Sequence, residues 1–139
     1  MRCLGLDIGD KRIGVAISDS EEILASPLVT ITKDDDEKTI EAILELVSKH
    51  GVQRIVVGMP YSLNGNMGMQ ANKVTAFVEM LSKCTEVTIE TWDERLSTVA
   101  AERLLVEAGA KRDKKRAQRD AAAAAFVLQG YLDSLKACD

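Results

Sequence analysis

Histidine and cysteine, the side chains that most often hold zinc or act as nucleophiles, are scarce in this chain of 139 residues. The one histidine, His50, precedes Gly51 where a helix is predicted to end, which favours a solvated role in the last helical turn over catalysis. The three cysteines, Cys3, Cys84 and Cys138, are odd in number, widely spaced and without a CxxC pair. This pattern argues against a disulfide framework and a zinc site, and it fits a reducing cytoplasm.

Long hydrophobic runs are also absent. No apolar stretch approaches the roughly 20 residues of a membrane span. The chain opens directly on a predicted strand, so we expect no signal peptide and no membrane partner. Hydrophobic residues make up 46% and charged residues 29% of the sequence, as is usual for a soluble globular protein. The length predicts a single domain, residues 1–139, with one sizeable core.

The net charge of −4 by itself argues against a nucleic-acid partner, but the charges are unevenly distributed. Residues 111–119, KRDKKRAQR, carry six basic side chains and one acid, whereas residues 34–45 hold six acids and one lysine. A concentrated basic segment can bind phosphates locally in an acidic protein. A solvated charged loop is the alternative explanation of the same segment.

Hydrophobic periodicity and turn signals predict five strands and four helices. The strands are expected at residues 2–8, 12–19, 27–32, 52–60 and 86–94. The helices are expected at residues 33–51, 69–83, 97–109 and 117–136. Three strands in a meander followed by strands that alternate with helices imply an α/β fold. Its sheet should be mixed, with three antiparallel strands, further parallel strands and helices on both faces.

The stretch LGLDIGDKRIGVAISD, residues 4–19, places an aspartate inside an otherwise apolar strand. The apolar face of this strand consists of Leu4, Leu6 and Ile8. Asp7 falls on the other face between Gly5 and Gly9, and glycine in a strand often marks close approach by a ligand or by another backbone. An unpaired buried charge is costly, so Asp7 requires a cation, hydrogen-bond donors or water. A hydrogen-bonded strand carboxylate is the structural alternative.

Two further acidic positions stand where structure alone does not require them. In WDERLST, Asp93 and Glu94 end a predicted strand and precede a predicted helix. Asp120 stands at the start of the predicted alanine-rich helix, one turn after the basic segment. Each has a structural explanation: Asp93 or Glu94 could serve the positive end of the following helix, and Asp120 could be a helix N-cap.

Topology favours a common role for these carboxylates. Open α/β sheets bind ligands at the carboxyl ends of their strands, where Asp7, the Asp93–Glu94 pair and Asp120 could converge. Converging carboxylates repel one another unless a cation lies between them, and oxygen ligands favour Mg²⁺ or Mn²⁺. Two such ions about 4 Å apart can clamp a phosphodiester for in-line cleavage. A metal-activated water is then the expected nucleophile.

Basic side chains lie close to these carboxylates in the sequence, and we expect them to bind the phosphates of a nucleic acid. They are Lys11, Arg12, Arg95, Lys114, Lys115, Arg116 and Arg119. Metal-bound carboxylates surrounded by such bases can accept a polyanion although the net charge of the chain is negative.

Four motif blocks of this sequence resemble the YqgF family, also called RuvX. They are GLDIGDKRIGVAISD, IVVGMP followed by LNG, DERLST, and DAAAAAFVLQGYLD, which together run from residue 5 to residue 133. The resemblance implies a ribonuclease-H-like fold. It also implies a nuclease that either matures the 5′ end of pre-16S ribosomal RNA or resolves Holliday junctions.

The same resemblance implies that Asp7, Asp120 and one of Asp93 and Glu94 are metal-binding carboxylates, with Glu94 favoured. The sequence departs from the family pattern only locally. The departures are Met59, Asn64 and Arg119 beside plain alanines. None of them removes a proposed ligand, so they bear on substrate detail alone.

Two rival functions remain at this point. The first block also resembles the phosphate motif of sugar kinases and actin-like ATPases, but those enzymes close two lobes over ATP and 139 residues supply one. A non-catalytic nucleic-acid adaptor of the same fold is the second rival. Among nuclease substrates we favour precursor rRNA over branched DNA. Junction resolution usually calls for a dimer, and no exposed apolar stripe predicts more than a monomer or a weak homodimer.

Overall fold

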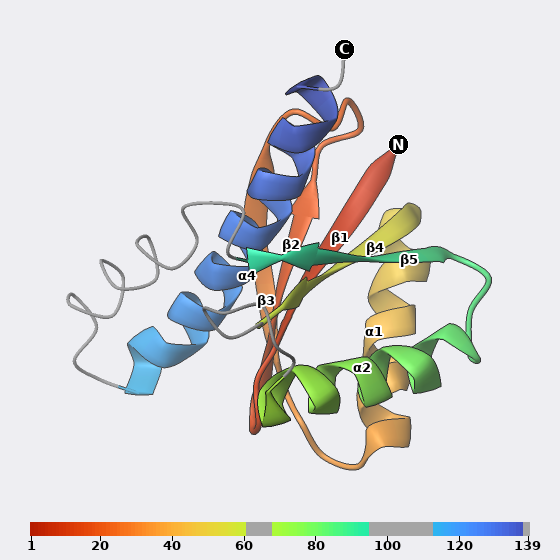
Figure 1. Cartoon of the computed structure of the whole chain (residues 1–139), viewed down its shortest axis with the longest axis vertical. Coiled ribbons are helices and arrows are strands. Elements are labelled where there is room, and N and C mark those ends of the chain that lie inside the picture. The colour runs from red at the N-terminus through yellow and green to blue at the C-terminus, as the bar shows by residue number, and fades with distance from the viewer. Residues whose placement is uncertain (61–67, 95–112, 138–139) are drawn as a thin grey trace.

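A five-stranded mixed sheet forms the centre of the computed structural model, which describes residues 1–60, 68–94 and 113–137 (Figure 1). The strands are β1 (Arg2–Ile8), β2 (Arg12–Ser18), β3 (Ala25–Thr32), β4 (Val52–Met59) and β5 (Thr88–Asp93). The strand order is β3-β2-β1-β4-β5, with antiparallel pairing among β1, β2 and β3 and parallel pairing of β4 with β1 and β5. The predicted mixed sheet is confirmed.

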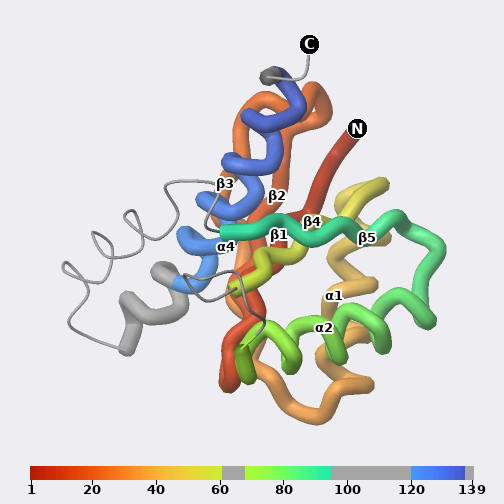
Figure 2. The backbone as a smooth tube through the Cα atoms, viewed as in Figure 1, coloured from red at the N-terminus to blue at the C-terminus, as the bar shows by residue number. Residues whose placement is uncertain are grey.

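Helices cover both faces of the sheet, as Figures 1 and 2 show. They are α1 (Asp36–His50), α2 (Met69–Ser82) and α4 (Asp113–Ala137). Helices α1 and α2 share one face, and α4 lies across the other. The helix predicted at residues 97–109 lies outside the described residues. Within the described part of the chain, no helix combines the length and apolarity that crossing a membrane requires.

Two hydrophobic clusters, one on each face, hold these layers together. On the α1 and α2 face, alternate residues of the strands pack against the apolar stripes of both helices. The largest fully buried members there are Leu4, Leu6, Ile13, Ile43, Ile55 and Leu81. On the α4 face, Cys3, Ala16 and Val56 pack against small and branched residues of the helix, including Ala124 and Leu128. The predicted apolar face of the first strand is therefore buried beneath α1 and α2.

The ends of α1 follow from local chemistry. Asp35 is the N-cap, and its carboxylate accepts a hydrogen bond from the backbone N–H of Lys38 at 2.8 Å. Gly51 ends the helix in the left-handed conformation at φ +64°, which glycine adopts without steric cost. His50 thus lies in the last helical turn, as predicted.

Among the element boundaries that differ from those expected, the starts of β3 and α4 have a clear physical reason. Strand β3 begins at Ala25, two residues before the expected start at Pro27, and the proline is tolerated inside it because β3 is an outer strand of the sheet. Helix α4 begins at Asp113, not at residue 117. Lysine, arginine, alanine and glutamine are good helix formers, so the basic segment continues the helix backwards. Asp120 therefore lies in the helix interior and is not its N-cap.

Candidate active site

Asp7 lies near the carboxyl end of β1, a central strand of the sheet, and is half-buried. Because side chains alternate along a strand and Leu6 and Ile8 pack beneath α1 and α2, Asp7 belongs to the face covered by α4. Its register partner on β2 is Gly14. On the other side, Leu6 pairs with Val57 of β4, so the next residues along the two parallel strands are Asp7 and Gly58.

Gly14 allows the backbone of α4 to lie directly against β2. A Cβ atom at this position would stand only 1.8 Å from the carbonyl oxygen of Asp120 and 2.3 Å from its carbonyl carbon. The missing side chain therefore places Asp120 over the residue that pairs with Asp7. The sequence shows a glycine here but gives no sign of what covers it.

Gly58 likewise leaves room on β4 for the side chain of Glu94, which directly follows β5. A Cβ atom on Gly58 would stand 2.7 Å from Oε1 of Glu94 and 3.0 Å from Cγ2 of Val127 on α4. The Glu94 carboxylate therefore lies over β4, on the face that α4 covers. Asp7 thus has Asp120 over the neighbouring strand on one side and Glu94 over the neighbouring strand on the other.

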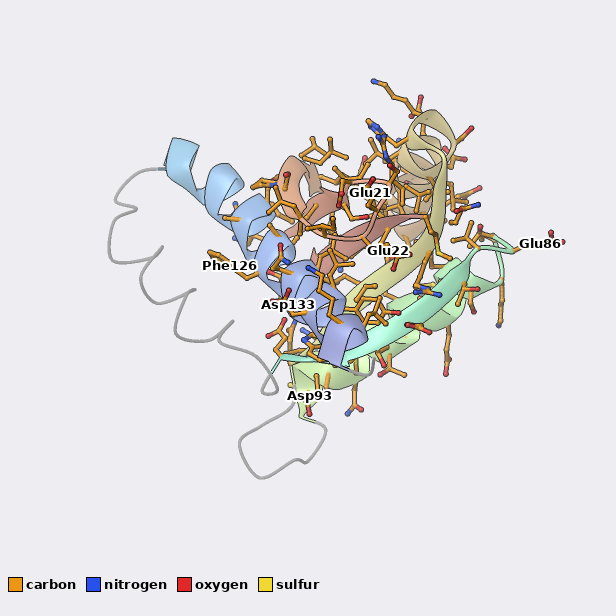
Figure 3. All side chains as sticks on the ribbon, turned by 90° about the horizontal axis from the view of Figure 1, so that it is seen from above. Glu21, Glu22, Glu86, Asp93, Phe126 and Asp133 are labelled. Atoms are coloured by element: carbon orange, nitrogen blue, oxygen red, sulfur yellow. The ribbon has the colours of Figure 1, made fainter. Side chains whose placement is uncertain are left out.

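The sheet register separates Asp93 from this group. Asp93 pairs with Met59, which is buried in the cluster beneath α1 and α2, and residues that pair across a sheet share a face. Figure 3 shows Asp93 at the end of β5. Of the two candidates in the DERLST motif, Glu94 is therefore the one that shares a face with Asp7 and Asp120.

A cation already contacts one of these carboxylates. The Nε–H of Arg12 donates to Oδ2 of Asp120 at 2.6 Å, an ion pair between residues 108 positions apart. Arg12 opens β2 two residues before Gly14, so both belong to the face beneath α4. The sequence predicted Arg12 only as a phosphate contact and did not predict this pairing.

The other predicted basic contacts are described in part. Lys11 is exposed in the turn between β1 and β2. Arg95 lies outside the described residues. The remaining four stand on the first turns of α4, on the helix that carries Asp120, and their side chains also lie outside the described residues: Lys114, Lys115, Arg116 and Arg119.

The side chains of Asp7, Glu94 and Asp120 suit a hard divalent cation such as Mg²⁺ or Mn²⁺, because all three offer carboxylate oxygens as ligands. Within residues 1–60, 68–94 and 113–137, however, no three histidine, cysteine, aspartate or glutamate side chains are arranged to hold a metal ion together. The three carboxylates share a face without forming a closed metal site, and the Asp120 carboxylate is engaged by Arg12. The metal assignment stays a prediction.

A polar cluster anchors α4 three turns beyond Asp120. The Tyr131 hydroxyl donates to Oε2 of Glu90 on β5 and accepts a hydrogen bond from Nη1 of Arg54 on β4 at 3.0 Å. Trp92 packs edge-on against the Tyr131 ring, with ring centroids 6.1 Å apart. Burial raises the pKa of Tyr131 to about 12, together with the hydrogen bond to Glu90 and the electrostatic effect of Glu90. This cluster, which sequence reasoning missed, fixes the position of α4 along the sheet.

Alkaline pH should weaken this anchor. A tyrosine whose pKa is higher in the folded than in the unfolded chain stabilises the fold below pH 10, and that stability is lost as the pH rises towards 12. The loss should reach about 1 kcal/mol by pH 11. Urea unfolding of wild type and Tyr131→Phe between pH 8 and pH 11 measures it. The difference in unfolding free energy between the two proteins should shrink as the pH rises, whereas a constant difference would contradict the assignment.

Comparison with known proteins gives matches over nearly the whole chain. The family model described as "RuvX: Holliday junction resolvase" matches residues 1–134. A protein of Desulforamulus reducens named "Putative pre-16S rRNA nuclease" is 48% identical over 134 residues, covering 96% of this chain and 98% of its own length. A protein of Halothermothrix orenii with the same name is 44% identical over 133 residues, covering 96% of this chain and 95% of its own length.

Solved structures agree with the fold. RuvC of T. thermophilus in complex with a Holliday junction substrate superposes with a TM-score of 0.63 at 14% identity, covering 98% of this chain and 96% of that chain. The ribonuclease-H-like fold inferred from the motif blocks is thus confirmed. The matching family model describes a resolvase, which disfavours the kinase alternative. A family model that matches nearly the whole chain and relatives that share almost half of its residues lead to one conclusion: the chain belongs to the RuvX family.

Proposed function

We propose that this protein is a metal-dependent nuclease that hydrolyses phosphodiester bonds during maturation of the 5′ end of pre-16S rRNA in the cytoplasm. The observation that carries the proposal is the placement of Asp7 between Glu94 and Asp120 on the face of the sheet covered by α4. Membership of a nuclease family supports the reaction class. The names of the relatives support the RNA substrate.

The roles of the residues follow from their positions. Asp7, Glu94 and Asp120 would hold one or two Mg²⁺ or Mn²⁺ ions, which when bound supply an activated water and stabilise charge on the reacting phosphate. Asp7 lies on the middle strand of the sheet, so we expect its backbone to be the most rigidly held of the three. We expect the bases in the first turns of α4, and Lys11 in the turn between β1 and β2, to attract the nucleic-acid backbone towards Asp120.

Junction resolution is the second candidate. The family description favours it, and the structural neighbour RuvC was solved with a Holliday junction substrate. Junction resolution differs from RNA processing in requiring two symmetric cuts. A nucleic-acid adaptor without cleavage is the remaining alternative, which the presence of all three carboxylates disfavours.

A side-by-side cleavage assay distinguishes these candidates. The substrates are a 5′-labelled precursor rRNA fragment that spans the mature 5′ end and a four-way DNA junction of matched length, each with Mg²⁺, Mn²⁺ or EDTA. We expect cleavage of the RNA at a defined position, only with a metal present. Paired symmetric nicks in the junction with intact RNA would establish the resolvase. Binding of either substrate without cleavage under every metal condition would overturn the nuclease and establish the adaptor.

A further inference from the structure

We propose that Arg12 is a built-in counter-ion of the carboxylate site, which neutralises Asp120 and competes with a divalent cation for it. The inference rests on the proposed metal-dependent function, because the competition matters only where a metal binds. It concerns the one residue in the described part of the site that already supplies a positive charge to a predicted ligand. Arg12 acts through Asp120 and is therefore a positioning residue.

Asp7, Glu94 and Asp120 belong to the face of the sheet covered by α4, and negative charges on one face repel one another. The ion pair between Arg12 Nε and Asp120 Oδ2, at 2.6 Å, offsets part of that repulsion in the metal-free protein. A divalent cation would offset the same repulsion. Arg12 and the metal therefore both supply positive charge to the Asp120 carboxylate, and binding of one disfavours binding of the other.

Strand β2 holds Asp120 by both its backbone and its side chain. Gly14 leaves room for the Asp120 backbone, and Arg12, two residues earlier on the same face, reaches the Asp120 side chain. One strand thus fixes both the main chain and the carboxylate of this helical residue. The turn that carries Arg12 is itself fixed, because the N–H of Gly9 donates to the Arg12 carbonyl at 2.9 Å.

The ion pair between Arg12 and Asp120 is partly exposed to solvent. The side chains of Arg12 and Asp120 are 33% and 25% exposed, so water and substrate can reach both. Nε is the guanidinium nitrogen with which Arg12 contacts Asp120. A guanidinium carries further N–H donors besides Nε, so Arg12 can also contact a phosphate oxygen of the nucleic acid. Transfer of the guanidinium from Asp120 to the substrate would leave the carboxylate to the metal.

Metal binding without nucleic acid tests the competition directly. Mn²⁺ titrations followed by electron paramagnetic resonance compare wild type, Arg12→Ala, Arg12→Lys and Lys11→Ala. Removing the competing charge should tighten Mn²⁺ binding by about three- to tenfold in Arg12→Ala. Arg12→Lys should remain close to wild type because the charge is retained. Lys11→Ala, with the same charge change in an exposed neighbour, should alter the affinity by less than about twofold.

A purely structural role predicts the opposite sign. If Arg12 only held α4 in place, Arg12→Ala would loosen Asp120 and weaken Mn²⁺ binding. Weaker or unchanged binding in Arg12→Ala therefore overturns the competition. A wild-type protein that binds no Mn²⁺ overturns the proposed metal-dependent function, and the counter-ion role is then decided by a second measurement that needs no metal.

That measurement is a double-mutant cycle of thermal unfolding in EDTA with Arg12→Ala, Asp120→Asn and the double variant. Arg12→Ala should lower the melting temperature in the wild-type background by several degrees more than in the Asp120→Asn background. Saturating Mn²⁺ should abolish that difference where the metal binds. Equal effects of Arg12→Ala in both backgrounds in EDTA would overturn the counter-ion role outright.

Discussion

Replacing Asp7 with asparagine is expected to lower the rate of cleavage by about 1,000-fold or more, which corresponds to about 4 kcal/mol of transition-state stabilisation. Asparagine keeps the shape of the side chain but removes the charge that would bind a cation between Glu94 and Asp120. Single-turnover cleavage of the preferred nucleic acid, at saturating Mg²⁺ and saturating enzyme, isolates this effect from substrate binding.

Asp10→Asn is the matched control for that experiment. Asp10 is a carboxylate only three residues further along, but it is exposed and pairs with Lys73 of α2 at 3.3 Å. Its replacement should leave the cleavage rate within about twofold, since exposed ion pairs contribute little. Circular dichroism should show the same fold in both variants. Asp7→Asn with wild-type cleavage would remove Asp7 from the site, and equal losses in both variants would indicate a general charge effect.

Much of the site's framework could be predicted from local patterns. The alternation of Leu4, Leu6 and Ile8 predicts which face Asp7 occupies, because the period of a strand is independent of the rest of the fold. The end of α1 at Gly51 could also be predicted, because the glycine lies directly after the segment that it terminates. The same reasoning placed the start of α4 too late, because a run of lysine and arginine suits a solvated loop and an exposed helix equally well.

The contacts between distant segments could not be predicted in this way. Arg12 and Asp120 stand 108 positions apart, and no spacing rule relates them. The choice between Asp93 and Glu94 depends on the pairing of β5 with β4, which places Met59 opposite Asp93. Local patterns indicate which side chains can do chemistry, and the register of the sheet decides which of them meet.

Gly14 is visible in the sequence, but only the structure shows that the backbone of α4 lies against it. We therefore expect Gly14→Ala to be severely destabilising. The new methyl group would stand 1.8 Å from the carbonyl oxygen of Asp120, a backbone atom that can move only with the whole of α4. We expect a loss of about 2–4 kcal/mol in unfolding free energy, with a fall in melting temperature of about 10 °C. Gly68→Ala, where the added Cβ meets nothing within 4 Å, is the control and should cost less than about 1 kcal/mol.

Cleavage by Gly14→Ala then reports on the geometry of the site. At a temperature where the variant is still folded, displacement of α4 should move Asp120 away from Asp7 and lower the cleavage rate by about 100-fold, since misplacement by about 1 Å has costs of that size. Gly68→Ala should retain its rate. A folded Gly14→Ala protein with wild-type cleavage would mean that catalysis does not depend on where α4 holds Asp120. If Gly14→Ala loses activity but keeps its stability, the substitution acts on the active site directly. The methyl group would then disturb Asp7 and Asp120 without displacing α4.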